Sequence, residues 1–219
     1  MNTYLNDNQT ELIKLMINIG HRLWERGYVA ANDGNISARI GKNEILITPT
    51  CVSKGFMSPG MIIRMTMDGE VISPGNKYSP SSEFRMHVQV YRERDDVTSV
   101  VHAHPPYCTS FAVAGIPLDR CALPEAILTL GPVPVAPYGT PSTEELPDSI
   151  KGYIKGCDAI LLANHGALTV GADLLTAYHR METIEHTAKI MHLAMALGNV
   201  NELPQKDVEK LMVIRDRMK

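Results

Sequence analysis

The chain lacks the features that mark several large classes of protein. Its four cysteines stand far apart and form no C-x-x-C pair, which favours reduced thiols over a disulfide framework. A formal net charge of −3 leaves no broad basic surface for nucleic acid. The apolar runs are too short to span a bilayer, and the polar N-terminus carries no signal-peptide pattern. We therefore expect a cytoplasmic protein with no membrane or nucleic-acid partner.

The composition is that of an ordinary globular protein. With 219 residues, of which 44% are hydrophobic, the chain can form one domain with a sizeable core over residues 1–219. Apolar residues recur at helical spacing in segments that predict helices over 9–26, 83–94, 107–114, 143–155, 173–197 and 206–217. Alternating or continuous apolar runs predict strands over 36–39, 44–48, 61–65, 98–103, 158–162 and 167–170.

The order of these elements indicates the fold class. The early strands follow one another as hairpins, whereas the later strands stand singly between helices. This order favours an α/β protein with three α/β/α layers around a central mixed, largely antiparallel sheet, rather than a regular doubly wound parallel sheet. Residues 117–141 are rich in proline, and we expect them to be irregular with a short strand at 133–135.

Two histidines lie at the end of the strand predicted over 98–103. In an extended chain, residues i and i+2 point to the same side, so His102 and His104 present two imidazoles on one face. His165 follows the buried strand over 158–162 and is placed to join them. A catalytic zinc ion is typically bound by three protein ligands such as histidines, which leaves coordination positions on the metal open to the substrate. The alternative is that each is a lone, hydrogen-bonded core or loop residue.

A second group of candidate ligands lies on the longest predicted helix. His179, Glu182 and His186 share one face at positions i, i+3 and i+7. The spacing lacks the tight H-E-x-x-H form of helical zinc sites. We interpret these residues as polar contacts between helices or subunits.

Three short segments could bind an anion. Ser81 and Ser82 precede a predicted helix, whose first backbone N–H groups attract phosphate, with Ser82 as the natural N-cap. A simple cap without a ligand explains these residues equally well. The turn at Gly34-Asn35 and the loop Thr48-Pro49-Thr50 would add donors to the same anion, and neither is specific by itself.

Taken together, the motifs are specific. Gly-Asn-Ile-Ser, Ile-Thr-Pro-Thr, Pro-Ser-Ser-Glu, Val-His-Ala-His and Asn-His-Gly occur in this order. The set resembles the class II aldolase/adducin-type family, and within it the L-fuculose-1-phosphate aldolases most closely, over residues 9–197.

The resemblance implies that His102, His104 and His165 bind zinc, or another divalent cation such as Mn²⁺ or Co²⁺. It implies that Glu83 binds the resting metal and then acts as the acid/base. It further implies a homotetramer with active sites between subunits, and phosphate-binding residues Gly34, Asn35, Thr48, Thr50, Ser81 and Ser82, with the backbone at Cys51 nearby.

The chain departs from this resemblance at three places. Cys51 stands where the aldolases usually have glycine, and its side chain narrows the accessible backbone conformations. The fuculose-phosphate aldolases carry a catalytic tyrosine in the segment that here reads Leu123-Pro124-Glu125, and a second one on the C-terminal tail, where residues 212–219 contain none. Glu125 is a candidate for a polar role in the pocket, with a plain loop carboxylate as the alternative. The residues that handle the aldehyde therefore differ.

The resemblance implies a zinc-dependent class II aldolase. Its substrate would be L-fuculose 1-phosphate or a related pentulose or deoxypentulose 1-phosphate, cleaved reversibly to dihydroxyacetone phosphate and an aldehyde. Zinc would stabilise the enediolate as a Lewis acid, and Glu83 would move the proton. The alternatives on the same scaffold are a pentulose-phosphate 4-epimerase, whose motif resembles Pro-Ser-Ser-Asp, and a sugar-phosphate dehydratase or decarboxylase. The last alternative function is a non-catalytic, adducin-like interaction domain.

Overall fold

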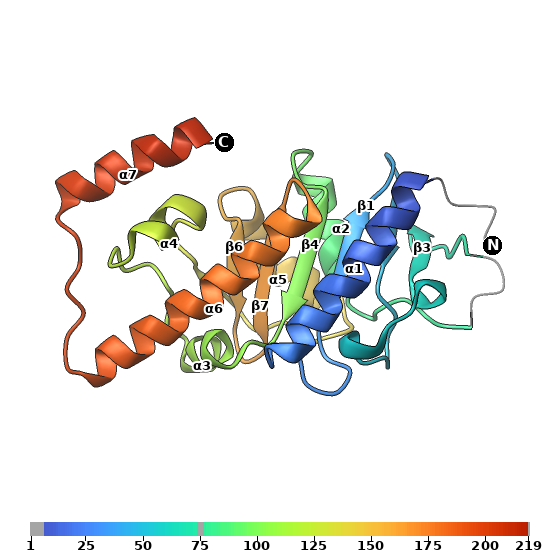
Figure 1. Cartoon of the computed structure of the whole chain (residues 1–219), viewed down its shortest axis with the longest axis horizontal. Helices are drawn as coiled ribbons and strands as arrows, with labels where there is room; N and C mark the ends of the chain where they lie inside the picture. Colours follow the sequence, from blue (N-terminus) through green and yellow to red (C-terminus); the bar gives the residue numbers. More distant parts are fainter. Residues whose placement is uncertain (1–6, 74–76, 219) are drawn as a thin grey trace.

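The computed structural model describes residues 7–73 and 77–218, and its centre is a seven-stranded sheet (Figure 1). The strands lie in the order β3-β2-β1-β4-β7-β6-β5. All neighbours pair antiparallel except β5 and β6, which are parallel. The predicted mixed, largely antiparallel sheet is therefore confirmed. The strands are β1 (Asn35–Arg39), β2 (Glu44–Ile47), β3 (Ile63–Thr66), β4 (Ser99–Ala103), β5 (Val135–Ala136), β6 (Ala159–Leu162) and β7 (Gly166–Gly171).

Helices cover both faces of the sheet, as the three-layer prediction requires. In Figure 1, α1 and α6 cross in front of the sheet, while α2 and α5 lie behind it. Two buried clusters separate along β4, because Val100 packs with the α2/α5 side and Val101 with the α1/α6 side. Among the described residues, no helix is both long and apolar enough to cross a bilayer. The helices are α1 (Asp7–Glu25), α2 (Phe84–Glu93), α3 (Pro106–Ala114), α4 (Pro124–Thr129), α5 (Glu145–Ile154), α6 (Leu174–Ala196) and α7 (Gln205–Met218), with short 3₁₀ turns η1 (Lys54–Phe56) and η2 (Pro59–Met61).

Three local predictions differ from the structure. The segment 117–141, expected to be irregular, contains α4, which begins at Pro124 because proline fits the first turn of a helix. The short strand expected at 133–135 is β5, shifted toward Ala136. Ser82 does not cap α2 either. The cap position is Glu83, no side chain caps the helix, and the Ser82 hydroxyl instead accepts a hydrogen bond from Ser142.

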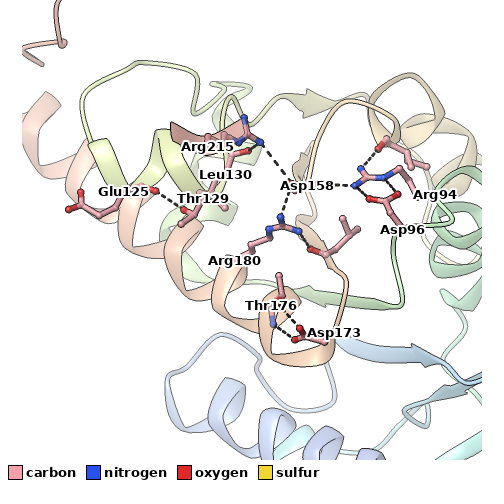
Figure 2. A network of polar contacts seen from close by, with 12 residues as sticks. Arg94, Asp96, Glu125, Thr129, Leu130, Asp158, Asp173, Thr176, Arg180 and Arg215 are labelled. Carbon is pink, nitrogen blue, oxygen red and sulfur yellow. Dashed lines mark hydrogen bonds and ion pairs between the residues drawn. The ribbon is translucent and has the colours of Figure 1, made fainter. Parts of the chain in front are cut away.

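A buried carboxylate connects the sheet to three helical segments (Figure 2). Asp158, just before β6, accepts hydrogen bonds from Arg94 Nη2 at 3.0 Å and from Arg180 Nη2 at 2.8 Å. Arg215 of α7 lies 3.9 Å from the same carboxylate and donates to the Leu130 carbonyl oxygen. Asp158 thus joins the end of α2, the middle of α6 and α7 to the sheet.

Replacing Asp158 tests this connection. Asp158→Asn leaves the guanidinium groups of Arg94 and Arg180 without their shared anion, so we expect the free energy of unfolding to fall by roughly 3 kcal/mol. Urea unfolding measures it. The matched control is Asp148→Asn, which breaks only an exposed pair with Lys151 and should cost about 0.5 kcal/mol or less. Equal midpoints for the two variants would contradict the assignment.

Candidate metal and anion site

The three predicted histidines come together at one end of the sheet. β4 lies at the centre of the sheet, between β1 and β7; it contains His102, and His104 follows its last residue, so the alternation of the extended chain turns both side chains to one side. The turn between β6 and β7 supplies His165, after Asn164 in the left-handed region with φ of 57°. The ring centroids lie 4.7 to 4.9 Å apart, and one ligand atom of each ring lies within 4.8 Å of the others.

Gly166 makes this approach of the two strands possible. A Cβ atom at this position would lie 2.6 Å from the Ala103 carbonyl oxygen and 2.6 Å from Cδ2 of His104. Backbone at that distance cannot give way, so only glycine fits. The glycine of the Asn-His-Gly motif is therefore required for steric reasons.

Hydrogen bonds fix the tautomers of His102 and His104. Nδ1 of His102 lies 2.9 Å from the Ala167 carbonyl oxygen, which only accepts, so Nδ1 carries the proton. Nδ1 of His104 faces the Asp33 carboxylate at 3.4 Å, and the same reasoning applies. In the neutral rings both Nε2 atoms are then unprotonated, yet they lie only 3.1 Å apart. Two lone pairs facing each other at this distance repel, and a proton or a metal ion between them would remove the repulsion.

The Glu83 carboxylate completes the group. Its Oε2 lies 3.4 Å from Nε2 of His102, and its Oε1 lies 3.2 Å from Nε2 of His165. Burial opposes ionisation of Glu83, but the His102 and His165 imidazoles and the Asn35 amide outweigh it and hold its pKa well below the usual range. Burial also lowers the pKa of His102 and of His104, which keeps those rings neutral. Neutral imidazoles with one ionised carboxylate are a donor set that fits a divalent metal ion.

Behind Glu83 lies a buried polar chain that sequence reasoning missed. Asn35 Nδ2 donates to Glu83 Oε2 at 2.8 Å, and Asn35 Oδ1 lies 2.5 Å from His87 Nε2. Nδ1 of His87 lies 2.7 Å from the Ser37 hydroxyl, which lies 2.7 Å from the Tyr91 hydroxyl. Burial lowers the pKa of His87 to about 4. The available signal was the spacing of Glu83, His87 and Tyr91, which stand four residues apart on one helix face.

The three predicted anion-binding segments lie side by side. A β-bridge between Pro49 and Pro80 joins the Thr48-Pro49-Thr50 loop to the serines, and the Ser81 N–H donates to the Thr48 carbonyl oxygen at 3.1 Å. Gly34, with φ of 72°, lies against β4, because a Cβ atom there would be 2.9 Å from the His102 carbonyl oxygen. The segments therefore adjoin the histidines.

Their side chains differ in accessibility. Thr48 is fully buried, and its hydroxyl accepts a hydrogen bond from the Ile36 N–H at 3.1 Å. Ser81 is also buried, Thr50 is half-buried, and Ser82 is exposed. Thr48 thus shapes the loop, whereas the side chains of Thr50 and Ser82 are accessible to a ligand from the solvent.

Lys54 is a second residue that sequence reasoning missed. Its Nζ atom donates to the carbonyl oxygens of Asn32 at 3.0 Å and Val52 at 2.7 Å, each two residues along the chain from Gly34 or Thr50. The residue is 1% exposed, and it has no ion-pair partner in the part of the chain that the structure describes. Burial lowers its pKa to about 8, so at neutral pH it adds positive charge to this corner. A lysine in a loop gave no sequence signal for burial.

The remaining candidates do not join the site. His179 and His186 are exposed on α6, and Glu182 instead pairs with Arg26 at 2.7 Å. Among the described residues, these three do not form a group with the spacing of metal ligands. Glu125 is exposed in the first turn of α4.

Comparison with known proteins gives a consistent set of matches. Residues 14–192 match the sequence profile of the class II aldolase and adducin N-terminal domain. An L-fuculose phosphate aldolase of Methanococcus maripaludis strain C7 is 34% identical over 81% of this chain and 94% of its own length. A 3-oxo-tetronate 4-phosphate decarboxylase of Haemophilus influenzae is 32% identical over 81% and 85%. A solved L-fuculose 1-phosphate aldolase structure superposes with a TM-score of 0.87, at 32% identity, over 94% of this chain and 97% of that one.

Cys51 provides a test of the anion loop. Its φ of 58° is in the left-handed region, which costs a residue with a Cβ atom about 1 kcal/mol or more. We expect Cys51→Gly to raise the free energy of unfolding by about 1 kcal/mol, less the entropy that glycine adds to the unfolded chain. Thermal unfolding measures the change. Cys51→Ala keeps the Cβ atom and should match the wild type; a glycine variant less stable than the alanine variant would refute the strain.

Proposed function

Because the chain belongs to the class II aldolase and adducin family, we propose that it is a metal-dependent lyase that cleaves a ketose 1-phosphate. The products would be dihydroxyacetone phosphate and an aldehyde. One observation carries the proposal: an ionised carboxylate and three imidazoles converge beside three anion-binding segments. The aldolase and decarboxylase relatives are named for phosphate esters, which agrees with that pairing of sites.

His102, His104, His165 and Glu83 would hold the metal, with Zn²⁺ as the proposed ion and Mn²⁺ or Co²⁺ as alternatives. The unprotonated Nε2 atoms of His102 and His104 support this, because they need a positive charge between them. His165 adds a buried Nδ1 atom with no hydrogen-bond partner among the described residues. When bound, such a cation supplies Lewis-acid stabilisation of the negative charge that develops on the substrate.

The substrate phosphate would lie against Gly34, Asn35, Thr50, Ser81 and Ser82, with Thr48 setting the shape of the loop. The buried Lys54 ammonium group supports an anion here, because it bonds the carbonyl oxygens of Asn32 and Val52, two residues from Gly34 and Thr50, and has no carboxylate partner among the described residues. Holding the phosphate would place the reacting carbon against Glu83 and would contribute to the rate by orientation.

Glu83 would transfer the proton at the carbon of the dihydroxyacetone phosphate half. Its ionised form is the base that condensation requires, and the same group returns the proton in cleavage. The hydrogen bond from Asn35 at 2.8 Å holds one carboxylate oxygen, so the other can approach the substrate. No lysine Schiff base is needed.

A sugar-phosphate decarboxylase is the second candidate. It is favoured by the 32% identity to the Haemophilus influenzae decarboxylase and by the absence of tyrosine from residues 123–125 and 212–219. A 4-epimerase is less well supported, because Glu83 takes the place of the aspartate that epimerases have, whereas a dehydratase stays an alternative. A non-catalytic, adducin-like role is disfavoured by the complete set of donor residues.

We further propose a cytoplasmic homotetramer with active sites between subunits. The support comes from α7, which lies over α4 at one end of the molecule (Figure 1). Three successive apolar residues of this helix, Met212, Val213 and Ile214, are 44 to 51% exposed in the single chain. Subunit contact would cover them.

A substrate panel tests the function. We expect the zinc-loaded protein to release dihydroxyacetone phosphate from at least one pentulose or hexulose 1-phosphate, measured with a coupled reductase. Glu83→Gln keeps the shape but not the base, and should lower kcat by at least about 10²-fold. The panel includes 3-oxo-tetronate 4-phosphate with detection of carbon dioxide. Turnover of that compound alone would replace the aldolase with the decarboxylase, and full activity of Glu83→Gln would refute the acid/base role.

A further inference from the structure

We propose that Tyr91, Ser37 and His87 form a one-way hydrogen-bond relay that orients the Asn35 amide and thereby positions Glu83 for proton transfer. The inference rests on the proposed function, because it gives Glu83 the acid/base role. It adds three positioning residues that lie outside the candidate metal site; His87 alone of the three contacts Asn35 of the anion-binding segments.

The direction of the relay follows from its chemical ends. The ionised Glu83 carboxylate only accepts, so Asn35 must present its Nδ2 group to Glu83 and its Oδ1 atom to His87. His87 Nε2 must then carry the proton that Oδ1 accepts. In a neutral ring this leaves Nδ1 as an acceptor, so the Ser37 hydroxyl donates to it, and Ser37 Oγ accepts from the Tyr91 hydroxyl. No link can be reversed without facing two acceptors against each other.

The residues of the relay are buried, so a reversed hydrogen bond would leave a polar group unpaired. Ser37 and His87 are fully buried, and Tyr91 and Asn35 are 1% and 3% exposed. Water cannot replace a lost partner at these positions, and an unpaired polar group there is costly. The titratable groups that act on the His87 ring are Glu83, at the cap position one helical turn before it, and the Tyr91 hydroxyl through Ser37; Arg39 lies over the Tyr91 ring at 5.0 Å.

The relay serves two tasks at Asn35. Its Nδ2 carries two N–H groups, and one of them is used by Glu83 Oε2. In the proposed site the second N–H would donate to the substrate phosphate that we place beside Gly34. If the amide turned over, its oxygen would face both the Glu83 carboxylate and the phosphate. His87 therefore sets the polarity of the amide for both groups.

A comparison of variants tests the relay. His87→Leu removes both links at the ring and should lower kcat by about 10- to 100-fold, as the loss of supporting hydrogen bonds typically does at metal sites. His87→Gln restores an N–H for Asn35 Oδ1 and should recover part of that loss. Tyr91→Phe removes only the outermost link and should cost about threefold or less. His186→Gln, an exposed histidine on α6, is the matched control and should leave kcat and KM unchanged.

A spectroscopic signature separates positioning from mere folding. In the zinc-loaded protein with ¹⁵N-labelled histidine, the ring of His87, assigned by its absence from His87→Gln, should be the neutral Nε2–H tautomer at pH 7. Loss of the Tyr91 hydroxyl should shift the Nδ1 resonance, through Ser37. An Nδ1–H tautomer or a protonated ring would overturn the relay even if His87→Leu fails to fold.

The outcomes for the two proposals are distinguishable. If the wild type turns over no sugar phosphate, the proposed function fails, whereas the tautomer still decides the direction of the relay. If the wild type is active and Glu83→Gln is not, but His87→Leu folds with wild-type kcat, the relay is refuted and the proposed function stands.

Discussion

The convergence of Glu83 on the imidazoles of His102 and His165 is the interaction on which the rest of the structure depends. A carboxylate removed from water is unfavourable unless positive charge and hydrogen bonds compensate it. Asn35 supplies a hydrogen bond to Glu83, but the neutral rings supply no positive charge, and the Nε2 atoms of His102 and His104 face each other. The divalent ion that we propose at these residues would supply the positive charge that both groups lack.

Several features of the fold can be understood as supports for this convergence. β4 is central, so His102 is held on both sides by antiparallel neighbours. Gly166 lets the turn that bears His165 approach β4 closely. At α2, Glu83 occupies the cap position without capping the helix, because its carboxylate is committed to the histidines and Asn35. Local helix stability is given up there in favour of the site, as functional positions often require.

The sequence predicts the elements and the histidine cluster well, because both depend on short-range periodicity. Alternation in a strand is enough to place His102 and His104 on one face, and the helical repeat is enough to find α1, α2 and α6. Prediction failed where tertiary contacts decide. Ser82 has the chemistry of a cap, but Ser142 engages its hydroxyl. Lys54 and His87 looked like ordinary loop and helix residues, and only their burial reveals their partners.

The comparisons place the chain in its family. They do not identify the aldehyde product, because residues 123–125 and 212–219 contain no tyrosine of the kind that handles the aldehyde in the fuculose-phosphate aldolases. A cation bound by the three histidines and Glu83 is common to the proposed aldolase and decarboxylase functions. Its most direct test is anomalous diffraction at the zinc edge from crystals grown with Zn²⁺. The account predicts one strong peak per chain, bounded by His102, His104, His165 and Glu83. No peak there, or a peak only at other residues, would contradict it.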